Sequence, residues 1–267
     1  MTGPGDWFSS EIVTALGLAL VHFVWQGTAI ATLAFALLSL TRHSTTRYAL
    51  GVCALVLMLA APVATFLLVS LPVSIPVEAV PATDAGAAAL PAPTDTSVIP
   101  ALQQRAAPVF PGVDPFFPAP DLMSWLVAGW LLGVVLLSLR AMAGYLHLRR
   151  MLREQTFTPT AHMLDLCWSL QRRIGLDRVI TYLACDWLDT PAALGWLRPV
   201  VLLPIASLSG LTQEQLEAVI VHELAHIRRL DFLVNLFQLL AETLFFYHPA
   251  VWWLNRRIRA EREYCCD

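Results

Sequence analysis

Residues 219–229 read Val-Ile-Val-His-Glu-Leu-Ala-His-Ile-Arg-Arg, and this stretch shapes the interpretation of the whole C-terminal half. His222 and His226 are spaced i, i+4, so on a helix their imidazoles lie one turn apart on the same face and can converge on one Zn²⁺. Glu223 can reach a water at the metal and take its proton as general base. Burying these groups among apolar neighbours without a ligand would cost free energy. The stretch therefore predicts a zinc-binding helix.

A catalytic zinc usually has three protein ligands and keeps one position for water. The third ligand is expected downstream on another helix, and Glu263 is the favoured candidate. Glu261 and Glu242 are the alternatives.

The apolar stretch 232–254 decides whether Glu263 can reach the histidines, because a membrane crossing there would put them on opposite sides. Four polar or titratable residues interrupt it: Asn235, Gln238, Glu242 and His248. Charged groups inside a membrane are expensive, and Pro249 suits the first position of a new helix. We therefore expect an antiparallel helix pair, 232–247 and 249–263, that folds back towards the zinc helix and lies against the membrane.

The composition is that of a membrane protein. Of the 267 residues, 57% are hydrophobic and 14% are charged, whereas soluble domains carry about 25% charged residues. The net charge of −3 provides no basic surface for nucleic acid. Three apolar stretches, 12–40, 48–71 and 122–146, each reach the roughly 20 residues that a membrane-spanning helix needs.

The arginines predict the orientation of these spans. They occur in the link 41–47 and after the third span, whereas the longer loop 72–121 holds only Arg105. We therefore expect a multi-pass protein of the inner or plasma membrane, with its N-terminus outside and its active site in the cytoplasm.

The predicted fold is a mainly α membrane protein with three transmembrane helices and a cytoplasmic α+β, zincin-like metallopeptidase domain with a small sheet. The expected domains are two transmembrane helices (1–71), a Pro/Ala-rich extracytoplasmic loop (72–121), a third transmembrane helix (122–150) and a zinc metallopeptidase domain (151–267). Within the last, we expect a helix at 161–174, strands at 178–184 and 200–203, and a helix from 213 to 229. Thr212 and Gln215 form its capping box. The strand 200–203 is interpreted as an edge to which an extended substrate can add.

Several stretches resemble the membrane metallopeptidases of the beta-lactam sensor-transducer family (BlaR/MecR type). They are residues 22–27, 47–50, 194–204, 221–231, 248–253 and 261–267. The resemblance implies a gluzincin-like site in which His222, His226 and Glu263 bind the metal and Glu223 is the general base. It also matches Asp267 to an acidic residue that orients a ligand histidine.

The family further implies signal transduction, in an antibiotic response, by regulated cleavage of the chain itself or of a cytoplasmic repressor. The expected partners are therefore a protein substrate and the lipid bilayer, with a second copy of the chain as a candidate. Such transducers usually continue into another span and an external sensor domain, whereas the sequence here stops at Asp267. Beta-lactam sensing is therefore not part of the prediction.

Two further residues have two interpretations each. Asp231 can hold a histidine or pair with Arg228 or Arg229, and a structural role at a helix end is favoured. His248 can stabilise the oxyanion of a tetrahedral intermediate or cap the helix that begins at Pro249.

Two other functions compete with a signalling peptidase. One is a non-proteolytic transmembrane scaffold with structural zinc, and the other is a housekeeping quality-control protease without a dedicated partner.

Overall fold

The computed structural model describes residues 10–70 and 120–265. Three helices in this part are long and apolar enough to cross a membrane: α1 (Ser10–Leu40), α2 (Ser44–Ser70) and α4 (Pro120–Glu154). The prediction of three spans is thus confirmed for the described residues. Most of the predicted external loop, and Asp267, lie outside them.

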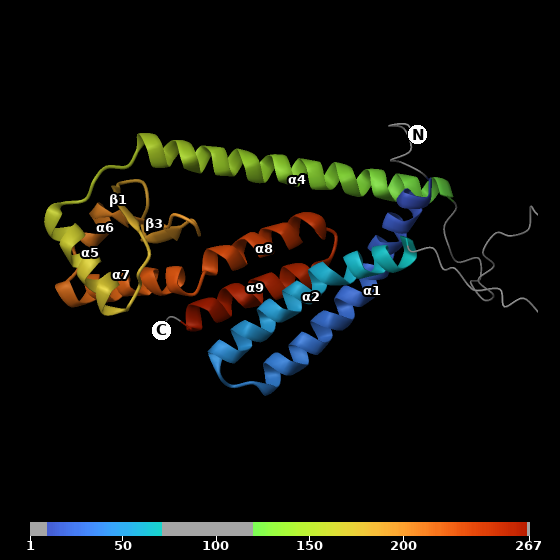
Figure 1. Cartoon of the computed structure of the whole chain (residues 1–267), viewed down its shortest axis with the longest axis horizontal. Helices are drawn as coiled ribbons and strands as arrows, with labels where there is room; N and C mark the ends of the chain where they lie inside the picture. Colours follow the sequence, from blue (N-terminus) through green and yellow to red (C-terminus); the bar gives the residue numbers. More distant parts are fainter. Residues whose placement is uncertain (1–9, 71–119, 266–267) are drawn as a thin grey trace, which may run out of the picture.

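A small lobe follows α4, at the end of the molecule opposite the start of α1 (Figure 1). It contains the following elements: α5 (Ala161–Arg173), β1 (Thr181–Cys185), β2 (Ala192–Leu194), β3 (Val200–Pro204), α6 (Ile205–Leu208) and α7 (Gln213–Arg228). The strand order is β1-β3-β2, with β1 parallel and β2 antiparallel to β3. The small sheet in a mainly helical protein agrees with the predicted fold class.

One prediction about this sheet is wrong, because the strand at 200–203 is not an edge. It belongs to β3, which lies between the two other strands and is buried from Val201 to Pro204. The edge on one side is β2, which has only three residues, Ala-Ala-Leu. So short a strand has no alternating pattern by which the sequence could have predicted it.

Helix α7 forms where the sequence predicts it. The Thr212 side chain accepts a hydrogen bond from the Gln215 backbone, and the Gln215 side chain bonds the Thr212 backbone, which completes the capping box. Ile220, Leu224 and Ile227 are buried in a core shared with α5 and the sheet. Their spacing leaves the neighbouring face of α7, with the two histidines of the motif, open to the C-terminal helices.

The expected helix pair is present as α8 (Asp231–Leu244) and α9 (Pro249–Tyr264). The two helices run beside α2, with α4 along the other side of α8 (Figure 1). They share a second hydrophobic core with α1 and α2, to which α8 and α9 contribute residues such as Phe245, Leu254 and Ile258. The hairpin thus inserts between the spans and does not simply lie against them. Its turn reaches the middle of α1, where His248 Nε2 donates to the Val24 carbonyl at 3.0 Å.

Two of the polar residues that argued against a fourth span, Gln238 and Glu242, bond to residues of α9 across the hairpin. Gln238 Nε2 donates to the Asn255 carbonyl at 3.0 Å, and Asn255 Nδ2 donates to the Gln238 carbonyl at 3.2 Å. Glu242 accepts from Asn255 at 3.0 Å and pairs with Arg259 at 3.1 Å. These bonds pair most of the polar groups that would be costly among apolar helices, so they specify how α8 and α9 face each other.

Two glycines allow this close packing. A Cβ on Gly27 would lie 2.8 Å from His248 Nε2, and a Cβ on Gly51 would lie 2.9 Å from Ile258 Cγ1. Small residues at helix contacts in membranes let the backbones approach closely.

Gly27→Leu is therefore expected to loosen the hairpin and lower the free energy of unfolding by about 1–3 kcal/mol, as overpacking does elsewhere. Thermal unfolding of the purified protein in detergent measures this. Gly129→Leu is the matched control, because nothing lies within 4 Å of a Cβ at that position of α4. Equal melting temperatures for the two variants would contradict the packing described here.

Candidate active site

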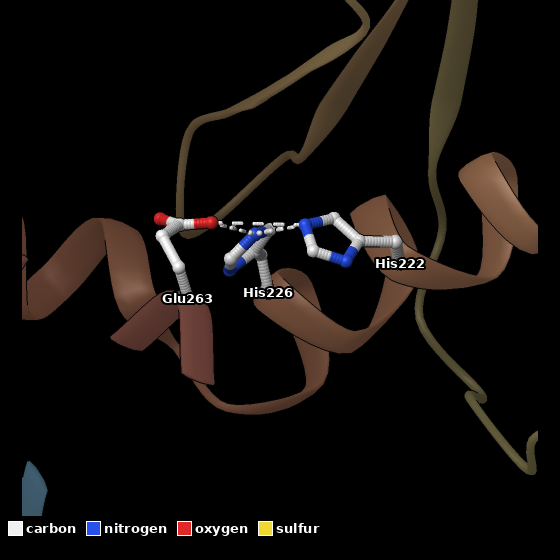
Figure 2. A group of neighbouring side chains, drawn as sticks. All are labelled: His222, His226 and Glu263. Carbon is white, nitrogen blue, oxygen red and sulfur yellow. Dashed lines mark hydrogen bonds and ion pairs between the residues drawn. The ribbon is translucent and has the colours of Figure 1, made fainter. Parts of the chain in front are cut away.

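Three potential metal ligands converge between α7 and the end of α9. His222 and His226 project from successive turns of α7, and the Glu263 carboxylate points towards them from the last turn of α9 (Figure 2). The two histidine Nε2 atoms are 3.3 Å apart, and Glu263 Oε2 lies 3.7 Å from one and 3.8 Å from the other. One potential ligand atom from each residue lies within 4.8 Å of the others. Residues far apart in the sequence thus meet at one point.

The separations suit a small divalent cation. Ligands at roughly 2.0–2.2 Å from a tetrahedral zinc would be about 3.3–3.6 Å from one another. The histidine pair matches this spacing, and Glu263 is slightly too far. Its side chain is 51% exposed, so it is free to move the few tenths of an ångström required. Two imidazoles and one carboxylate are also the donor set of known catalytic zinc sites.

Asp231 orients one of the histidines. Its side chain is buried and sits at the first residue of α8, 2.7 Å from His226 Nδ1. With Nδ1 engaged by a carboxylate, Nε2 is the nitrogen of His226 that can bind a metal, and it faces the other two side chains. Asp231 also pairs with Arg229 at 3.4 Å. Among the ion pairs of the described residues, Asp231 has none with Arg228. The helix-end position and the contact with a histidine therefore occur together.

Glu223 lies beside the histidines, half-buried against the sheet edge. Burial raises the pKa of Glu223 above its ordinary value, while the charge of His226 and a hydrogen bond from the Ala193 backbone oppose that rise. The carboxylate thus stands between α7 and β2, where a proton acceptor would face both the metal site and the strand.

A cleft of about 390 Å³ opens over these groups. Its walls come from α7, from β2 with the turn after it, and from the facing ends of α8 and α9. The walls add residues to which the sequence pattern had assigned no role in the site, among them Trp196, Asn235 and Arg262. Arg262 donates to Glu263 Oε1 at 3.2 Å and to Asn235 Oδ1 at 3.3 Å, so it directs the carboxylate. Its place next to Glu263 in the chain was the only signal for this role.

The two alternative ligands have other partners. Glu261 is 1% exposed and pairs with Arg47 at 2.7 Å and Arg257 at 3.0 Å. Glu242 pairs with Arg259 inside the helix hairpin. Neither lines the cleft, so Glu263 alone among the three candidates faces the histidines.

His248 does not line the cleft, and its predicted catalytic role is not supported. It caps α9 at the end opposite Glu263, where its Nδ1 accepts a hydrogen bond from the Ala250 backbone at 3.2 Å. Its Nε2 bonds Val24 of α1, so both ring nitrogens have partners. The capping interpretation is the one that describes this residue, because α9 separates it by four turns from the proposed chemistry.

The different burial of Glu261 and Glu263 predicts effects of different size on the stability of the metal-free protein. Glu261→Ala should lower the free energy of unfolding by about 3 kcal/mol, because it leaves two partly buried arginines without their carboxylate. Glu263→Ala should change it by about 0.5 kcal/mol or less, as at other surface positions. Chemical unfolding in detergent with a chelator present measures both. A larger loss from Glu263→Ala would mean that this residue supports the fold.

The chain matches a known peptidase family. Residues 22–267 match the family described as BlaR1 peptidase M56. The regulatory protein BlaR1 of Bacillus licheniformis is 26% identical over 140 residues, which are 52% of this chain and 23% of that protein. The chain thus matches only about a quarter of this relative's length. With a family match over most of its residues and three helices able to cross a membrane, the chain belongs to the M56 family of membrane metallopeptidases.

Proposed function

We propose that this protein is a zinc metalloendopeptidase that cleaves a protein segment at the inner face of the membrane. His222, His226 and Glu263 would hold the metal, and their convergence from two helices is the observation that carries the proposal. The substrate is either the enzyme's own chain or a cytoplasmic regulator. The name of the Bacillus relative, a regulatory protein, supports a role in signalling.

The chemistry follows from the groups around the cleft. When bound, Zn²⁺ supplies a Lewis acid that polarises the scissile carbonyl and lowers the pKa of a water to about 7. Glu223 accepts the proton of the attacking water and delivers it to the leaving amine. Burial raises the pKa of Glu223, which favours the uptake of a proton by this carboxylate.

Strand β2 is the natural guide for the substrate. It is an edge strand, it lines the cleft through Ala193 and Leu194, and it lies next to α7. An extended peptide can add to such an edge by backbone hydrogen bonds, which would lay its scissile bond across Glu223. This assigns to β2 the role that the sequence had suggested for residues 200–203.

The cytoplasmic orientation is supported by the arginines. The site lies close to Arg47 at the start of α2, and the lobe follows the arginine-rich end of α4. Positively charged ends of membrane helices favour the cytoplasmic side.

Metal analysis tests the ligand set. Wild-type protein dialysed against buffer should retain about one Zn²⁺ per chain, as expected for a site with three protein ligands. His226→Ala and Glu263→Gln should lose most of it. Glu154→Gln is the matched control, since this exposed carboxylate pairs only with Arg150 among the described ion pairs. Full zinc retention in His226→Ala would remove the basis of the proposal.

Glu223→Gln separates a peptidase from a scaffold. Loss of the general base should reduce cleavage of the chain itself, or of an unstructured protein substrate, about 10²–10⁴-fold while zinc stays bound. Mass spectrometry of the products and metal analysis measure the two effects. Glu217→Gln on the same helix, where the side chain pairs with Arg173, is the control. Unaltered cellular signalling by a Glu223→Gln protein would favour the non-proteolytic scaffold.

A further inference from the structure

The first turn of α2 lies at the end of a membrane span. It contacts Asp231, which orients His226, and α9, which carries Glu263. We propose that Tyr48 in this turn is a positioning residue, which sets the orientation of His226 through Asp231 and so couples the span to the site. The inference rests on the proposed function, because it concerns the same metal site.

A continuous hydrogen-bond path runs from Tyr48 to His226. The Tyr48 hydroxyl donates to Asp231 Oδ1 at 2.9 Å, and Asp231 Oδ2 lies 2.7 Å from His226 Nδ1. The two contacts use different oxygens, so the carboxylate bridges a membrane helix and a candidate metal ligand. Asp231 is only 3% exposed, so water has little access to replace a lost hydroxyl.

Arg229 competes with His226 for the Asp231 carboxylate, so the Tyr48 hydroxyl matters for the orientation of that carboxylate. Its guanidinium stacks 4.9 Å from the centre of the Tyr48 ring and lies 3.4 Å from Asp231 Oδ2, the same oxygen that faces His226. With the hydroxyl in place, Asp231 Oδ1 is held by Tyr48 and Oδ2 stays on the histidine. Without it, the carboxylate can rotate towards the arginine, and His226 Nε2 loses its fixed direction.

The residue before Tyr48, Arg47, contacts the helix that carries Glu263. Arg47 pairs at 2.7 Å with buried Glu261, which precedes Glu263 by two residues on α9. Two consecutive residues of α2 therefore contact both sides of the metal site. Arg47 binds α9, the helix that carries Glu263. Tyr48 binds Asp231, the carboxylate that orients His226. A shift of this turn along or about the axis of α2 changes both contacts together. The span thus has a direct route to the separation of the candidate ligands.

Tyr48→Phe tests the relay, because it removes one hydroxyl and keeps the ring under Arg229. We expect the Kd for Zn²⁺ to rise about 10-fold, the lower end of the effect of outer-shell partners. Competition with a chelating dye measures it on the full chain in nanodiscs. Tyr182→Phe is the matched control: its hydroxyl donates to Gln171 at 3.0 Å, in the lobe core. Metal-free melting temperatures separate a lost fold from a misdirected ligand.

Asp231→Ala provides a second measurement. If the hydroxyl acts through this carboxylate, adding Tyr48→Phe to Asp231→Ala should leave the Kd unchanged within about twofold, because the two changes interrupt one path. Zinc affinity in Tyr48→Phe equal to that in Tyr182→Phe, or a full 10-fold further loss in the double variant, would overturn the relay while leaving the zinc site intact. Wild-type protein without zinc at His222 and His226 would overturn the proposed function as well.

Discussion

The reversal of the chain between α8 and α9 is the constraint on which the metal site depends. Had residues 232–254 crossed the membrane as one helix, Glu263 would lie across the bilayer from the histidines. His248 and Pro249 stop one helix and start the next, since the histidine caps the backbone and proline lacks the donor that a continuous helix would need. The second helix then returns along the first, and its last turn meets α7.

The hairpin also connects the candidate metal site to the membrane-spanning helices. Its polar groups bond to one another across the two helices, and its apolar groups join the core of α1 and α2. The lobe has a separate core around α5, the sheet and α7. The site lies where these two cores meet, so its ligands come from both bodies. A displacement of the spans relative to the lobe therefore acts on the ligand geometry itself.

Sequence reasoning succeeded where the signal was local. The i, i+4 histidines, the Thr212 capping box and the three apolar spans depend on periodicity and on neighbours in the chain, and the structure contains each of these elements. It failed where the answer depends on which elements become neighbours. β3 lies inside the sheet because three-residue β2 covers its side, and the pattern of β2 is too short to recognise. His248 resembles a catalytic residue in isolation, but α9 carries it away from the cleft.

The sequence by itself determined that this is a membrane protein, that α7 presents two histidines on one face, and that the chain turns back before Glu263. These properties follow from hydrophobicity, helical spacing and proline, which act over a few residues. Only the tertiary structure decided which of three glutamates faces the histidines, because burial and arginine partners withdraw Glu261 and Glu242. It alone brought Tyr48 to Asp231, since a hydrogen bond between residues 183 positions apart has no signature in local sequence.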